Sequence, residues 1–169
     1  MNQSAPLPKR SPRRGAMAIE IGVTVVLLFA LLFLVLDLSM VLFVRSTLQQ
    51  AVREGVRTGV TGVLHGSTTY LNDSITHVVQ REALGFLNGP EGACRVQISY
   101  FDPSSGAAST GAQGDIVVVA VRNYHYTPLG AVLKSADPLS ISVSSSDVIE
   151  KCPVGGCPAA VNPNPPACP

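Results

Sequence analysis

Glu20 has the clearest chemical signature in this sequence. It lies five residues after Gly15, follows the basic pair Arg13 and Arg14, and stands directly before an uncharged apolar run over Ile21–Leu36. A lone carboxylate at the mouth of a membrane helix is destabilised unless a positive group pairs with it. In the simplest interpretation, Glu20 lies among the lipid headgroups and is attracted by the two preceding arginines.

Residues typical of catalysis are sparse. His65, His77 and His125 are scattered, and no Gly-x-Ser-x-Gly or His-Glu-x-x-His motif occurs. We therefore expect neither an enzyme nor a cofactor. The alternative is an enzyme whose active site lies in the part of the chain after the apolar run. A deep pocket with two convergent titratable groups would support it.

Four cysteines follow the apolar run: Cys94, Cys152, Cys157 and Cys168. An even number in an oxidising compartment favours disulfides, and three pairings can be drawn. One set joins Cys152 to Cys157 and Cys94 to Cys168. The alternative is a metal site that combines Cys94 with His65 or His125. It is disfavoured because the paired C-x₂-C clusters of zinc sites are absent, so no metal is expected.

The apolar character extends from Ala16 to Val44 and is interrupted by Asp37. About 29 residues make about 43 Å of helix, against a hydrocarbon core of about 30 Å, so one membrane span is predicted over 16–44. The excess length lets an acid lie near an interface. A cleaved signal peptide is the alternative, but its apolar region is usually only about 7 to 15 residues long.

Basic residues are unevenly distributed around this span. Lys9, Arg10, Arg13 and Arg14 precede it, and only Arg45 follows closely. The positive-inside rule therefore predicts a cytoplasmic N-terminus and an exported C-terminal part. The whole chain has 12 positive and 11 negative residues, and without these four N-terminal basic residues it has 8 and 11. This charge balance does not indicate a surface that binds nucleic acid.

Beyond the span the apolar period stays helical. Leu48, Val52, Val56 and Val60 recur every four residues, which predicts an amphipathic stem that continues the membrane helix. Glycines at 55, 59, 62 and 66 should end this helix near Gly62–Gly66. A second helix is predicted over Thr69–Leu87, with Leu71, Ile75, Val79 and Ala83 on one face and Asn88-Gly89-Pro90 ending it.

After Gly92 the pattern becomes alternating, which is typical of strands. Strands are predicted at Val96–Tyr100, at Ile116–Tyr126 in the centre of the sheet, and around Leu139–Val143, with a short helix at Pro128–Lys134. The fold class is therefore α+β, with a small antiparallel sheet packed on helices. The expected organisation is a leader at 1–15, a span at 16–44, a head at 45–151 and a Cys/Pro-rich tail at 152–169.

The N-terminal third resembles the TadE-like proteins, minor pseudopilins of tight-adherence (Flp) pilus systems. The resemblance rests on Arg14-Gly15-Ala16-Met17-Ala18-Ile19-Glu20, the apolar span, and the stem Arg45-Ser46-Thr47-Leu48-Gln49-Gln50-Ala51-Val52-Arg53-Glu54-Gly55-Val56-Arg57. Leader, acid, span and stem occur in register. Ile21 departs from the Tyr that major Flp pilins carry at this place.

The resemblance implies a pilin-like fold and cleavage between Gly15 and Ala16 by a prepilin peptidase. Glu20 would then be the fifth residue of the processed chain, where its carboxylate pairs with the new α-amino group during subunit docking. Asp37 is expected to make a polar contact between packed helices or to lie near the outer interface. The implied partners are the lipid bilayer, the peptidase, other pilin subunits and an assembly platform in the bacterial inner membrane, with the head periplasmic. The alternative function is an unprocessed, membrane-anchored adhesion or binding module.

Overall fold

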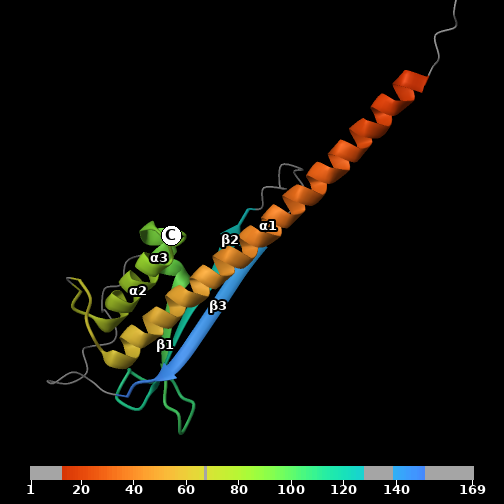
Figure 1. Cartoon of the computed structure of the whole chain (residues 1–169). Coiled ribbons are helices and arrows are strands. Elements are labelled where there is room, and N and C mark those ends of the chain that lie inside the picture. Colours follow the sequence, from red (N-terminus) through yellow and green to blue (C-terminus); the bar gives the residue numbers. More distant parts are fainter. Residues whose placement is uncertain (1–12, 67, 128–138, 151–169) are drawn as a thin grey trace, which may run out of the picture.

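A single long helix, α1, runs from Arg13 to Thr61. The structure is a computed structural model, and it describes residues 13–66, 68–127 and 139–150. At about 1.5 Å per residue, the 49 residues of α1 extend for about 73 Å (Figure 1). The helix ends where Gly62 adopts a left-handed φ of 63° and donates its N–H to the Thr58 carbonyl at 3.0 Å. The predicted end near Gly62 is confirmed.

The two halves of α1 have different surroundings. From Met17 to Phe43 its large apolar side chains are largely exposed, whereas Val44 and Leu48 are fully buried. The helix is long and apolar enough to cross a membrane. The predicted stem face is confirmed, because Leu48, Val52 and Val56 all belong to the core. Figure 1 shows the N-terminal half projecting beyond the head.

Within the predicted helix over Thr69–Leu87 the structure has α2 at Leu71–Glu82. A further helix, α3 at Gly89–Arg95, follows it and was not predicted. The predicted helix was too long, because Leu84 and Gly85 take left-handed φ values of 51° and 92° and stop α2. Gly89 and Pro90 begin α3 instead of terminating its predecessor. The predicted apolar face of α2 is nevertheless buried: Leu71, Ile75, Val79 and Ala83.

The sheet has three antiparallel strands in the order β1-β2-β3: β1 at Val96–Phe101, β2 at Ile116–Tyr126 and β3 at Leu139–Val148. Val96 pairs with Val121 on one side of β2, and Ile116 pairs with Val148 on the other. The central position predicted for Ile116–Tyr126 is therefore confirmed. A register shift interrupts the β2–β3 pairing between Val121 and Tyr124.

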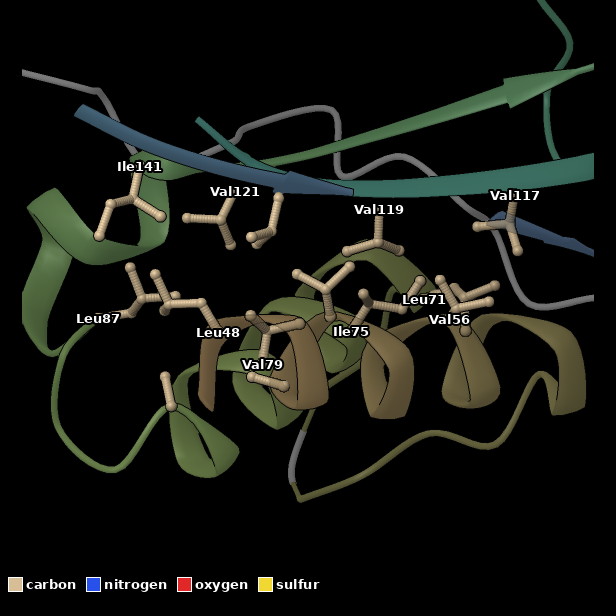
Figure 2. Packing of buried hydrophobic residues seen from close by; sticks show 14 of the residues in the cluster. Leu48, Val56, Leu71, Ile75, Val79, Leu87, Val117, Val119, Val121 and Ile141 are labelled. Atoms are coloured by element: carbon tan, nitrogen blue, oxygen red, sulfur yellow. The ribbon is translucent and has the colours of Figure 1, made fainter. Parts of the chain in front are cut away.

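The core lies between one face of the sheet and the helices α1 and α2 (Figure 2). Val117, Val119 and Val121 of β2 point toward Leu48, Ile75, Val79 and neighbouring apolar residues. Close packing depends on Gly55, where a Cβ would lie 2.5 Å from Val79 Cγ2. At Gly59 a Cβ would lie 3.2 Å from Val117 Cγ2. Both glycines therefore let the sheet and α2 approach the helix backbone.

This arrangement is α+β, as predicted. The predicted helix at Pro128–Lys134, most of the leader at 1–15 and the tail at 152–169 lie outside the described residues. Because α1 passes without a break from the exposed apolar half into the packed half, the head is joined to the apolar segment by a continuous helix.

Candidate functional site

Glu20 lies on α1 among exposed apolar side chains. It is seven residues from the first residue of the helix, about 10 Å along the axis. Ile19 and Ile21 beside it are exposed, and the Thr24 hydroxyl donates to the Glu20 backbone carbonyl at 2.9 Å, not to its carboxylate. With the side chains that the structure describes, which begin at Met17, Glu20 makes no ion pair. Its exposed carboxylate can thus be reached by a positive group outside the helix.

Gly15 and Ala16 lie in the first turn of α1, where the backbone is already helical. The first four N–H groups of a helix have no acceptor within it, so this turn is the least constrained part of α1. Ala16 precedes Glu20 by four residues, which places the two positions on one face of the helix, about 6 Å apart along its axis. An amino group at Ala16 would therefore lie within reach of the Glu20 carboxylate.

Asp37 follows Glu20 by 17 residues, which is about 26 Å of helix. This separation is close to the thickness of a hydrocarbon core, so the two acids lie near opposite ends of the apolar segment and not together. Asp37 is half-buried and engaged in an interaction. The structure therefore distinguishes them: Glu20 is exposed on the projecting half of α1, and Asp37 lies where the helix approaches the head.

Cys94 lies at the end of α3, two residues before β1, and its thiol is not free. The other cysteines of the sequence, Cys152, Cys157 and Cys168, lie outside the described residues. Which cysteines pair therefore stays a prediction.

The histidines do not converge. The backbone N–H of His65, in the loop after α1, donates to Ser74 Oγ at 2.7 Å, whereas His125 is exposed near the other end of the head, on β2. Among the residues that the structure describes, no group of three or more His, Cys, Asp or Glu side chains could hold a metal ion.

An aromatic cluster joins the head to α1 and was not foreseen from the sequence. Phe86, between α2 and α3, lies edge-on between Phe43 of α1 and Tyr124 of β2, with ring centroids 6.2 Å apart in both pairs. The Arg95 guanidinium donates to the carbonyl of Asn123, which has a left-handed φ of 54° at the register shift. Burial raises the pKa of Tyr124, although the charge of Arg95 opposes this effect.

Sequence periodicity alone did not reveal the cluster because its rings come from three separate elements. One available signal was the scarcity of aromatic residues, which make up 5% of the chain.

The comparisons with known proteins agree with this geometry at the N-terminal helix. A family model described as "TadE-like protein" matches residues 15–57, about a quarter of the 169-residue chain. The match covers the exposed apolar half of α1 and most of its packed half, and it confirms the resemblance for those residues. It associates the chain with tight-adherence pilus systems. No curated protein and no solved structure matches.

Proposed function

From its TadE-like region, we propose that this chain is a minor pseudopilin-like component of tight-adherence pilus biogenesis. A prepilin peptidase cleaves it after Gly15, and the remaining chain is anchored in the inner membrane and assembles through α1. The observation that carries this proposal is the exposed carboxylate of Glu20 among the exposed apolar side chains of α1. It lies five residues after a glycine, on a helix that continues into a folded head.

Cleavage explains how an acid is tolerated in this position. It creates an α-amino group on Ala16, which is one helical turn from Glu20. In a low-dielectric setting neither charge is favourable alone, but a close pair compensates much of the desolvation. The amine can belong to the same chain or to an adjacent subunit. In the second case the pair sets the axial register between neighbouring helices and selects the correct docking partner.

Orientation follows from the four basic leader residues, Lys9, Arg10, Arg13 and Arg14. They keep the N-terminus cytoplasmic, where the peptidase acts, and place the head in the periplasm. In this proposal the head is a structural and interaction module and not a catalytic one. Its oxidising location is also where the predicted disulfides would form.

Processing is tested by co-expression of the full chain with a prepilin peptidase. The wild-type protein is expected to lose the leader, which intact mass spectrometry measures directly. Gly15→Val should retain full length, because a branched side chain replaces the small residue at the bond to be cleaved. Gly22→Val is the matched control in the same helix and should be processed normally. A wild-type protein that keeps its full-length mass in the presence of the peptidase would remove the pseudopilin mechanism.

The role of Glu20 is tested separately by Glu20→Gln, which removes the charge and keeps the shape. Membrane insertion should be unchanged, and assembly into pili or recruitment to the assembly complex should fall strongly. If insertion itself is lost, Glu20 acts in targeting. An uncleaved leader together with normal insertion would instead support a membrane-anchored binding module, for which the projecting helix is only a tether.

A further inference from the structure

The depth of the head relative to the apolar segment can be calculated from the contacts between α1 and β2. A Cβ at Gly59 would touch Val117, and one at Gly55 would lie 3.6 Å from Val119 Cγ1. Two residues of β2 thus match four residues of α1, as the rises of about 3.3 Å and 1.5 Å per residue require. The two elements therefore run nearly side by side with opposite chain directions.

The same spacing locates the far end of β2. Tyr126 is nine residues beyond Val117, or about 30 Å along the strand. This distance corresponds to about 20 residues of helix and brings Tyr126 level with about Met40 of α1. Leu139 pairs with Tyr126 and lies at the same level. Figure 1 agrees, because β2 and β3 extend alongside the middle of α1.

The level of the membrane surface follows from the length of the apolar segment. A hydrocarbon core of about 30 Å takes about 20 helical residues, so a span that begins at Met17 ends near Leu36. The headgroup layer adds about 5 to 8 Å on each side, which carries it to about residue 40 or 41. Tyr126 and Leu139 therefore fall within that layer.

The side chains at this level suit a lipid interface. Phe43 is 49% exposed and Leu139 is 47% exposed, while Tyr124 and Tyr126 are half-buried. Aromatic rings of this kind concentrate where acyl chains meet headgroups. Exposed Arg45 and Arg122 lie about one and two helical turns beyond this level, on α1 and β2, from where their long side chains can extend toward lipid phosphates.

Among the residues that the structure describes, few acids lie in this region, and two of them already interact with other groups. Glu82 pairs with Arg81 at 2.9 Å, and Asp37 has an interaction of its own. Glu91 is exposed on α3. At the opposite end, the β1–β2 loop and the end of β3 carry Asp102, Asp115, Asp147 and Glu150. Among the described residues, acids are therefore more numerous at the end of the head remote from the apolar segment.

We propose that the membrane-proximal rim, formed by Phe43, Arg122, Tyr124, Tyr126 and Leu139, binds the lipid headgroup layer of the membrane that α1 spans. The rim seats the head against the bilayer and limits its tilt. Lipid is favoured over a second copy of the chain because the continuous helix already fixes the rim at headgroup depth. The inference rests on the membrane anchor alone and holds whether or not the leader is cleaved.

The chain has no tryptophan, so a single introduced indole reports its own depth. The full chain is reconstituted in vesicles of phosphatidylcholine and phosphatidylglycerol, with and without lipids brominated at shallow acyl positions. Tyr126→Trp is the rim reporter. Phe101→Trp is the matched control, because Phe101 is a half-buried aromatic residue near the opposite end of the sheet. Phe43→Trp reports the depth of α1 itself.

Brominated lipid should quench Tyr126→Trp at least twofold and leave Phe101→Trp unquenched. Adding Arg122→Gln to the rim reporter should reduce the quenching in phosphatidylglycerol mixtures. Quenching of Phe43→Trp without quenching of Tyr126→Trp would overturn the lipid contact while preserving the anchor. Absence of quenching at both sites would overturn the assigned span as well. If brominated lipid does not change the emission of Tyr126→Trp, but the emission changes with the density of protein in the vesicles, the rim contacts a second copy of the chain and not lipid.

Discussion

Gly55 is the position where the joint between the anchor and the head is most easily tested. A Cβ there would lie 2.5 Å from Val79 Cγ2 and 3.4 Å from Ile75 Cγ2, against an optimal carbon–carbon separation of about 3.5 to 4.0 Å. Gly55→Ala thus forces an overlap of about 1 Å into a packed layer, which costs about 1 to 3 kcal/mol. The higher helix propensity of alanine stabilises the helix by about 1 kcal/mol. The free energy of unfolding is therefore expected to fall by about 1 kcal/mol in total.

The overlap can be isolated by shortening its partner. Val79→Ala removes the clashing methyl group but leaves a cavity, and should cost about 2 kcal/mol. In the double variant the new methyl group occupies part of the vacated space, and the gain in helix propensity remains. We therefore expect the double variant to be destabilised by only about 1 kcal/mol, whereas simple additivity would give about 3 kcal/mol.

The free energy of unfolding of the head is measured by pulse proteolysis of the full chain in nonionic micelles across a urea series. Gly22→Ala is the matched control, because no atom lies within 4 Å of the Cβ it adds. It should leave the midpoint of head unfolding unchanged. Additive losses in the double variant would refute the close approach between α1 and α2 at this point.

Two further predictions concern buried polar groups in the head. Tyr100 donates its hydroxyl to Asn72 Oδ1 at 2.7 Å, and burial raises its pKa above the usual range. The unfolded tyrosine ionises near pH 10 while the folded one stays protonated, so stability should fall as the pH rises above about 10. Tyr100→Phe should cost about 1 kcal/mol at neutral pH and flatten that decline, measured as urea midpoints from pH 8 to 11; an identical slope would contradict the assignment. The buried Asp115 carboxylate accepts hydrogen bonds from the Ser109 hydroxyl and the Ala112 N–H. Asp115→Ala should cost about 1 to 3 kcal/mol by leaving these donors unpaired, and an unchanged urea midpoint would show that water replaces the carboxylate.

Periodicity predicted the elements whose apolar residues repeat without interruption. The stem residues Leu48, Val52 and Val56 are buried as expected. β2 has the predicted bounds, and its first six residues, Ile116–Val121, are apolar throughout, as is typical of a central strand. The predicted second helix is longer than α2, because the apolar period of the sequence continues past Ala83. Gly85 was the available stop signal, and the left-handed conformation of Leu84 before it had no counterpart in the sequence pattern.

Part of the candidate site could likewise be predicted from the sequence, and part could not. Glu20 and Gly15 could be singled out from sequence, because both lie on one continuous helix where spacing along the chain gives spacing in three dimensions. The aromatic cluster could not, because Phe43, Phe86 and Tyr124 are brought together only by the packing of α1, the α2–α3 turn and β2.

The central claim is that a new amino group at Ala16 compensates the carboxylate of Glu20. The most direct test is N-terminal sequencing of the protein recovered from the membranes of cells that make functional pili. We expect the chain to begin at Ala16. A chain that still begins at Met1 in those cells would contradict the account, because the compensating amine would then not exist.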